Sequence, residues 1–128
     1  MSETAGMTSK EIGQKLVDLC KAGKNHEAMQ ELYAADIVSV EAGAPPGGQR
    51  EVNGLPAVMA KGKQWSEMHE IHSAKVDGPF PHDDRFAVMF DYDVTRRPDK
   101  QRFQMKEVAL FTVANGKIVR EEFFYSMG

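Results

Sequence analysis

The stretch FQMKEVALFTVANGKIVREEFFYSM, residues 103–127, carries the clearest fold signal in the chain. Apolar residues that favour β-structure lie on both sides of Asn115-Gly116, and this dipeptide is typical of a tight turn between antiparallel strands. We therefore expect a β-hairpin, with strands at 103–113 and 117–127.

The sequence before this hairpin predicts two more strands. Residues 86–95 alternate between apolar and polar side chains, as in a strand with one buried face. Residues 71–76 form a further candidate strand, which we expect to end at Asp77-Gly78-Pro79. The polar segment RRPDKQ, residues 96–101, is typical of a turn. We therefore expect the C-terminal half to form a sheet.

The N-terminal half has the apolar spacing of helices. Thr8 and Glu11 fit a capping box, in which each residue caps a backbone N–H of the other. The expected elements are helices at 8–23 and from about 25, a strand at 37–41, a loop at 43–49 and a helix that begins near Pro56. Helices followed by strands predict an α+β fold, an antiparallel sheet with helices on one face.

The length and charge of the chain limit the class of protein. At 128 residues and 14.3 kDa, one domain is expected, which we place at 8–128 after a flexible tail at 1–7. The 16 Lys and Arg against 19 Asp and Glu give a net charge of −3. This acidic balance argues against nucleic-acid binding, which requires a basic face.

The sequence lacks an apolar membrane span, a secretory signal and a second cysteine, and each absence limits where the protein is expected or what it can bind. No apolar run approaches the roughly 20 residues that span a bilayer, and the first residues do not read as a secretory signal. We therefore expect a cytoplasmic protein without a membrane partner. Cys20 is the single cysteine, which excludes an intrachain disulfide and a multi-cysteine zinc site.

Carboxyl groups within apolar strands are the strongest chemical clue. Glu41 ends the first expected strand, Glu107 lies in one arm of the hairpin, and Glu121 and Glu122 lie in the other. Neighbours on a strand point to opposite faces, so only one of Glu121 and Glu122 can join a common site. A carboxyl group on an apolar face loses hydration, which raises its pKa and makes it a proton donor or acceptor near neutral pH.

The turn of the hairpin decides which glutamate faces Glu107. A two-residue turn pairs Ala114 with Lys117 and places Glu122 opposite Ala109. A three-residue turn pairs Val113 with Lys117 and places Glu121 opposite Ala109 instead. A slip of one residue changes every face of a strand, and the apolar pattern alone leaves both registers open.

The other polar residues have simpler structural explanations. Asp91 and Asp93 lie on the polar face of their strand and are expected to be solvated. His69 and His72 are three residues apart and do not match the His-Glu-x-x-His zinc motif, so we expect no metal site. The glutamates of the hairpin could equally pair with Lys or Arg across the sheet.

Three segments of the chain resemble one known family. They are LYAADIVSVE at 32–41, VDGP at 76–79 and GKIVREEFFY at 116–125. With the order of elements, they resemble the cone-shaped α+β barrel of nuclear transport factor 2, ketosteroid isomerase and the SnoaL polyketide cyclase. The resemblance implies a strongly curved, mostly antiparallel sheet around N-terminal helices, a central pocket, and homodimers through the outer sheet face.

Compared residue by residue, the resemblance is mixed. Glu41 falls where ketosteroid isomerase has its general base, but its two oxyanion donors correspond to about Leu16 and Ala109, which cannot donate. A usual ketosteroid isomerase is therefore not expected, and the comparison favours the three-residue turn. The implied catalytic candidates are Glu41, Glu107, Glu121 and Tyr125. The implied substrate-binding positions are Leu16, Trp65, Val88, Phe90, Tyr92, Ala109, Phe111 and Phe123.

The resemblance implies chemistry without a cofactor or metal. We expect an isomerase, cyclase or hydrolase that acts on a small hydrophobic molecule through carboxylate acid–base chemistry. One alternative is a non-catalytic protein that binds a small molecule in the same pocket. The other is a dimeric protein-interaction module, because this fold supports several functions.

Overall fold

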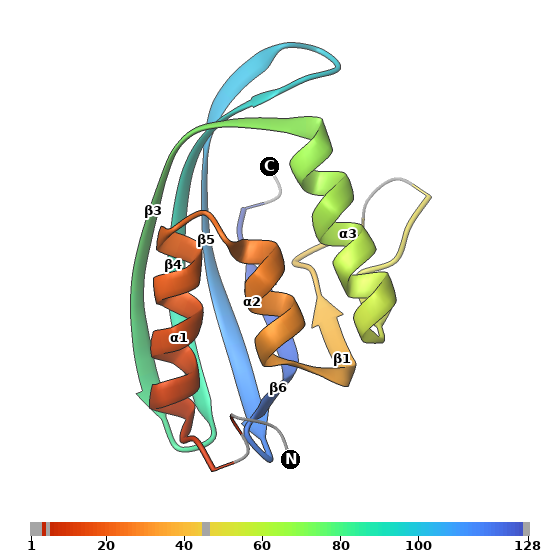
Figure 1. Ribbon diagram of the computed structural model, residues 1–128. Helices are drawn as coiled ribbons and strands as arrows, with labels where there is room; N and C mark the ends of the chain where they lie inside the picture. The colour runs from red at the N-terminus through yellow and green to blue at the C-terminus, as the bar shows by residue number, and fades with distance from the viewer. Residues whose placement is uncertain (1–3, 5, 45–46, 127–128) are drawn as a thin grey trace.

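The structure is a computed structural model in which residue 4 and residues 6–44 and 47–126 are described. Three helices and six strands follow one another along the chain (Figure 1). In order they are α1 (Ser9–Lys21), α2 (Asn25–Leu32), β1 (Tyr33–Val40), β2 (Glu51–Asn53), α3 (Leu55–Met68), β3 (His69–His82), β4 (Arg85–Arg96), β5 (Gln101–Ala114) and β6 (Lys117–Phe124).

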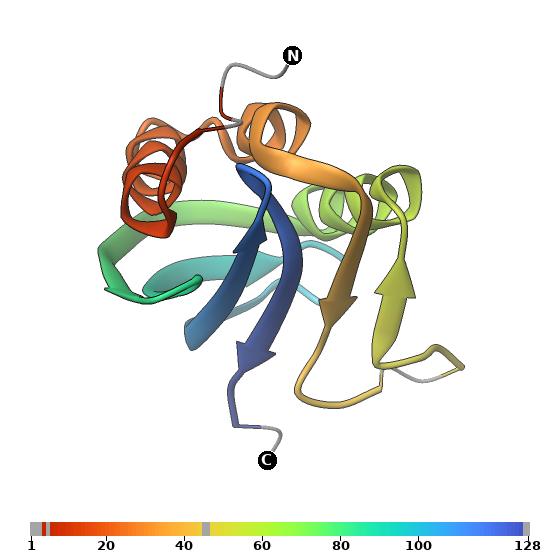
Figure 2. The ribbon, with the colours of Figure 1, turned by 90° about the horizontal axis from the view of Figure 1, so that it is seen from below.

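The six strands form one curved sheet that does not close. Their order is β2-β1-β6-β5-β4-β3, and β1 runs parallel to β6 while the other neighbours are antiparallel. All three helices cover the concave face of the sheet, as the two perpendicular views show (Figures 1 and 2). The α+β fold expected from the sequence, with a curved sheet around N-terminal helices, is therefore confirmed.

The first helix begins as the sequence predicts. The Thr8 side chain accepts a hydrogen bond from the Glu11 backbone N–H at 3.2 Å, and the Glu11 side chain accepts one from the Thr8 backbone at 3.0 Å. Helix α1 then turns its apolar stripe, which includes Ile12, Leu16 and Val17, onto the sheet. The capping box therefore fixes where the helix starts.

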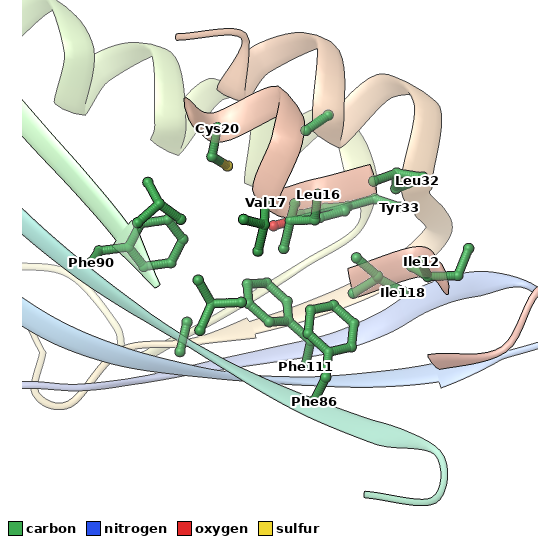
Figure 3. Packing of buried hydrophobic residues seen from close by; sticks show 14 of the residues in the cluster. Ile12, Leu16, Val17, Cys20, Leu32, Tyr33, Phe86, Phe90, Phe111 and Ile118 are labelled. Atoms are coloured by element: carbon green, nitrogen blue, oxygen red, sulfur yellow. The ribbon is translucent and has the colours of Figure 1, made fainter. Parts of the chain in front are cut away.

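The core lies between the helices and the concave face of the sheet. Phe86 on β4 and Phe111 on β5 stack with ring centroids 4.9 Å apart, beneath the side chains of α1 (Figure 3). The alternation predicted for 86–95 is confirmed, because the even-numbered residues of that strand are buried and Asp91 and Asp93 lie on the outer face.

Three strand boundaries differ from the sequence prediction. Strand β1 begins at Tyr33 rather than at 37, and the short strand β2 was not expected. Strand β3 does not stop at 77–79 but continues to His82, with a register shift between Asp77 and Phe80 that accommodates Gly78-Pro79. A bulge therefore replaces the predicted strand end.

The hairpin between β5 and β6 combines features of both predicted registers. Its turn has two residues, since Ala114 pairs with Lys117 and both Asn115 and Gly116 have positive φ, so the favoured three-residue turn is wrong. The register then shifts between the pairs Val113↔Ile118 and Thr112↔Arg120. Val119 is the extra residue of this β-bulge.

The bulge decides which glutamate faces the helices. Beyond it, Phe111 pairs with Glu121 and Ala109 pairs with Phe123. Glu121 is buried on the concave face and Glu122 pairs with Arg120 on the other face. Beyond the bulge, the odd-numbered residues of both strands therefore share the concave face, as the three-residue turn had implied. The expected pairing of Glu121 with Ala109 is wrong.

The ends of the chain lie partly outside the described residues. Of the tail expected at 1–7, residues 1–3 and 5 are not described, while Thr4 is buried and Met7 packs against the core. Strand β6 ends at Phe124, and residues 127–128 of the expected domain also lie outside the description. No helix in the described part of the chain is long and apolar enough to cross a membrane.

Candidate functional site

A buried carboxylate lies at the centre of the concave face. Only 2% of Glu121 is exposed, and both of its oxygens accept hydrogen bonds. The hydroxyl group of Tyr33 donates to Oε1, and the hydroxyl group of Ser39 donates to Oε2 at 2.6 Å. Tyr33 and Ser39 lie on β1, and Ser39 is the Cα partner of Glu121 on β6. The parallel pairing of β1 and β6 therefore brings these groups together.

Burial and hydrogen bonding change the pKa of Glu121 in opposite directions. Loss of hydration raises its pKa, while the hydrogen bonds from Ser39 and Tyr33 and the charge of Lys61 lower it, and the rise prevails. The same environment acts on Cys20 of α1, since burial and the nearby Glu121 charge raise the pKa of its thiol to about 12. Cys20 is therefore an inert core residue.

Lys61 of α3 links this buried carboxylate to a second one. Its ammonium group donates to Ser39 Oγ at 2.6 Å and to Glu41 Oε1 at 2.7 Å. The ammonium group also lies over the ring of Phe123, 5.5 Å from the centroid. These contacts connect Glu121, Ser39, Lys61 and Glu41 in one continuous network.

Glu41 is held at the end of β1, where the strand meets the following loop. The hydroxyl group of Tyr125 donates to Glu41 Oε2 at 2.9 Å, so both oxygens of this carboxylate also have donors. The Glu41 backbone exchanges hydrogen bonds with Arg50 at 2.8 and 3.1 Å. Glu41 and Tyr125 line a surface hollow of about 170 Å³ together with Phe123 and neighbouring residues.

Glu107 of β5 is the third carboxyl group on the concave face. It is half-buried, and its carboxyl group has no hydrogen-bond partner among the described residues. Burial raises its pKa to about 7, with smaller contributions from the charges of Glu41 and Glu121, while Lys61 opposes the rise. Glu107 therefore changes its protonation state near neutral pH, which Asp and Glu residues in water do not do.

An aromatic group continues the concave face beyond these carboxyl groups. Trp65 stacks on His69 with ring centroids 4.4 Å apart and lies 5.8 Å from Tyr92. The Nδ1 atom of His69 lies 2.8 Å from the backbone oxygen of Trp65, so this nitrogen carries the proton. Phe103 meets His69 edge-on at 6.2 Å.

The predicted catalytic residues lie together, and the predicted binding positions divide into two groups. Glu41 and Tyr125 are in direct contact, and Glu121 lies near enough to Glu107 for its charge to raise the Glu107 pKa. Trp65 and Phe123 are half-buried at the edge of the core. The other positions are at most 8% exposed and form part of the core, namely Leu16, Val88, Phe90, Tyr92, Ala109 and Phe111. Their contact with a ligand stays a prediction.

Three residues of the network were missed by the sequence analysis. Lys61 follows Val58 by three residues and precedes Trp65 by four, so it lies on the buried stripe of α3, and a charged residue in that position was a usable signal. Tyr33 lies in β1, four residues before the strand start that the sequence predicted, so it was not recognised as a neighbour of Glu121. Ser39 alternates with Ile37 on the inner face of β1, which the strand pattern could have indicated.

The outer face of the sheet has a separate and larger hollow, of about 430 Å³. Its lining includes Asp91 and Asp93, which bond to Gln104 and to Arg102 at 2.8–3.0 Å. These aspartates lie on the outer face, away from the concave carboxyl groups, and their partners Arg102 and Gln104 were not predicted from the sequence. Among the described residues, no cluster of His, Cys, Asp or Glu has the arrangement of a metal site.

A curved α+β sheet that holds acidic groups against its helices defines the class of this protein. The chain belongs to the SnoaL-like domain family, whose sequence pattern matches residues 7–125. No curated protein in the comparison matches the chain.

Solved structures agree with this assignment. A candidate SnoaL-like polyketide cyclase from Mesorhizobium loti is 40% identical, with a TM-score of 0.88 over 93% of this chain and 100% of that one. An NTF2-like protein from Burkholderia thailandensis is 21% identical, with a TM-score of 0.77 over 93% and 91%.

A protein from Catenulispora acidiphila with a ketosteroid isomerase-like fold, solved in complex with trimethylamine, is 19% identical with a TM-score of 0.71 over 94% and 88%. At these lower identities the last two support the fold alone. The family predicted from the sequence is therefore confirmed.

Proposed function

We propose that this protein is a cofactor-independent enzyme of the isomerase or cyclase type, which acts on a small hydrophobic molecule by carboxyl acid–base chemistry. The family and the 40% identity to a candidate polyketide cyclase support this class of reaction. Glu107 would take the proton from a carbon atom of the substrate. Glu41 and Tyr125, which line the hollow, would hold the substrate. Glu107 lies near enough to this hollow for the charge of Glu41 to raise its pKa.

The state of the Glu107 carboxyl group carries this proposal. A general base works best when its pKa lies near the working pH, and the pKa of Glu107 is about 7. The carboxyl group has no hydrogen bond to break among the described residues before it accepts a proton. Glu41 and Glu121 already accept two hydrogen bonds each, which makes them poorer bases.

The missing oxyanion donors narrow the class of reaction. Leu16 and Ala109 are buried apolar residues, 3% and 0% exposed, so the isomerase donors have no counterpart at these positions. The Tyr125 phenol lies at the hollow, and it can supply one donor to a developing negative charge if its hydroxyl group turns from Glu41 to the substrate. One donor supports substrates with modestly acidic carbon atoms.

The opening of 5-nitrobenzisoxazole tests the proposal without a known substrate. A base removes the ring C–H proton, the C–H electrons complete a nitrile, the N–O bond breaks, and a coloured phenolate leaves. We expect the protein to accelerate this reaction with a rate that rises through about pH 7 and then levels off. Glu107→Gln should lower the rate by about 100-fold or more, the usual contribution of a general base.

The matched control is Glu67→Gln, which removes an exposed carboxyl group of α3. It should retain the full rate. A wild-type rate no higher than that of buffer, or an unchanged rate in Glu107→Gln, contradicts the proposed chemistry.

A non-catalytic binding protein is the second candidate. The buried apolar side chains at Leu16 and Ala109, where the isomerase donors would stand, favour it. The hollow beside Glu41, about 170 Å³, would have to widen to take such a ligand. Ligand sites usually measure about 300–1,000 Å³. A hydrophobic molecule that co-purifies unchanged and raises the melting temperature, with no turnover in the assay above, would support this candidate.

The outer sheet face supports the proposal of a homodimer. Met89, Val108 and Phe124 are exposed apolar residues that pair directly across β4, β5 and β6. Val108→Lys should shift the molecular mass measured by light scattering from dimer to monomer, whereas Ile71→Lys, at another exposed apolar residue, should not. A wild-type monomer would contradict the dimer. The cytoplasmic location expected from the sequence stays a prediction.

A further inference from the structure

Lys61 joins two carboxylates that belong to different strands. Its ammonium group bonds directly to Glu41, which follows β1, and reaches Glu121 of β6 through the hydroxyl group of Ser39. About a quarter of the Lys61 and Glu41 side chains is exposed, at 28% and 22%, whereas Glu121 is buried. The network therefore extends from the protein surface into the core.

The direction of each hydrogen bond follows from the chemistry of the groups. An ammonium group can only donate, so Ser39 Oγ accepts from Lys61. The single proton of the Ser39 hydroxyl group is then free to point at Glu121 Oε2, which lies 2.6 Å away. Because Tyr33 donates to the other oxygen, both oxygens of Glu121 act as acceptors, as in an ionised carboxylate.

We propose that Lys61 is a positioning residue of the acid–base site, which aims Glu41 and, through Ser39, holds Glu121 as a carboxylate. Glu107 is thereby left as the carboxyl group that exchanges protons. The catalytic part of this inference rests on the proposed function. The arrangement itself can be tested on the free protein.

The groups that face this network come from five parts of the fold. They are Cys20 of α1, Tyr33 of β1, Tyr92 of β4, Glu107 of β5, and Tyr125 after β6. Among the interactions that alter the pKa values of Glu107 and Glu121, Lys61 is the positive charge that lowers both. Removal of the ammonium group should therefore raise both pKa values.

The experiment is an NMR titration of the side-chain carboxyl carbons in protein with labelled glutamate. In the wild type, Glu107 should titrate near pH 7. In Lys61→Met, its midpoint should rise by roughly one pH unit, and Glu121 should titrate at a higher pH than in the wild type. Lys61→Arg keeps the charge and should restore most of the wild-type behaviour.

The matched control is Lys63→Met, which removes an exposed lysine of the same helix that lies 3.9 Å from Glu67. Its titration curves should match those of the wild type. Unchanged Glu107 and Glu121 midpoints in folded Lys61→Met, or an equal shift in Lys63→Met, would overturn the proposal.

Ser39→Ala provides a second test if Lys61→Met does not fold. It removes the hydroxyl group between Lys61 and Glu121 but leaves the bond from Lys61 to Glu41. The midpoint of Glu121 should therefore rise. An unchanged Glu121 midpoint contradicts a route through Ser39.

The titration separates this inference from the proposed function. A wild-type protein that does not open 5-nitrobenzisoxazole, but shows the expected shifts, would refute the catalytic role and retain the positioning role. An active wild type whose pH–rate midpoint does not move in Lys61→Met would refute the positioning role alone. If both hold, the pH–rate midpoint should move upward with the Glu107 midpoint.

Discussion

The hydroxyl group of Ser39 donates to Glu121 Oε2 at 2.6 Å, across the pair of strands in the sheet that run parallel. Glu121 is one of the largest fully buried side chains among the described residues. A buried carboxylate needs such donors, because burial without them costs several kcal/mol. Ser39 is therefore a structural requirement as well as a link in the acid–base network.

Ser39→Ala should lower the free energy of unfolding by about 1–3 kcal/mol, the usual cost of a buried polar group that loses its partner. Urea unfolding at pH 7 measures this difference. The control is Ser66→Ala on α3, where the exposed hydroxyl group bonds to the Gly62 backbone at 3.1 Å. It should change stability by no more than about 0.5 kcal/mol, and an equal effect of both substitutions would show that Ser39 has no special role.

Glu107 should make the protein less stable as the pH rises from about 4.5 to about 7. Its pKa is about 7 in the folded protein and near its ordinary value of 4.5 in the unfolded chain. Between these values the folded state binds more protons, so deprotonation favours unfolding. Glu107→Gln should remove this pH dependence. Relative to the wild type, its free energy of unfolding should therefore rise by roughly 1–3 kcal/mol between pH 4.5 and pH 8. Parallel pH profiles of the two proteins in urea unfolding would contradict the raised pKa.

Gly13→Ala should destabilise the protein, although alanine is the better helix former. An added Cβ atom at Gly13 of α1 would lie 2.7 Å from Cβ of Pro79 and 3.0 Å from the ring of Phe86. We expect a loss of about 1–3 kcal/mol, as for overpacking in a core. Thermal unfolding measures the change.

Gly62→Ala on α3 is the matched comparison for Gly13. Its new Cβ atom would meet only the flexible end of Met29, at 2.9 Å from Cε, and this end can move away. The substitution should therefore be neutral or stabilise the protein by up to about 1 kcal/mol. If both glycines respond alike, α1 does not approach the sheet as closely as described.

Cys20 should not react with thiol reagents in the folded protein. It is buried, the pKa of its thiol is about 12, and only the thiolate reacts. At pH 8 the reaction with a disulfide reagent should be on the order of 1,000-fold slower than in urea-unfolded protein. The single cysteine makes the assay unambiguous, and rapid labelling without unfolding would contradict its placement.

Local signals in the sequence predicted most of the fold. The capping box at Thr8, the alternation at 86–95 and the turn at Asn115-Gly116 each depend on a few neighbouring residues, and all three are present. The face of Glu121 depends instead on the bulge at Val119, where one extra residue reverses the alternation. No local pattern marks this bulge, so the correct face was predicted from an incorrect turn.

The candidate site was predicted less completely than the fold. Its acidic residues were identified because carboxyl groups are unusual within apolar strands. Their donors were missed because Tyr33, Ser39 and Lys61 are ordinary residues until tertiary structure brings α3, β1 and β6 together. A hydrogen-bond network between residues more than 80 positions apart leaves no periodic trace in the sequence.

The place of β6 between β1 and β5 has a consequence for the order of events during synthesis. While the ribosome has produced the chain only as far as β5, β1 and β2 have no sheet neighbour on the β6 side, and Glu121 and Tyr125 do not yet exist. The last strand must insert between two segments already made, a long-range step that slows folding. The acid–base network therefore assembles only when translation has passed residue 125.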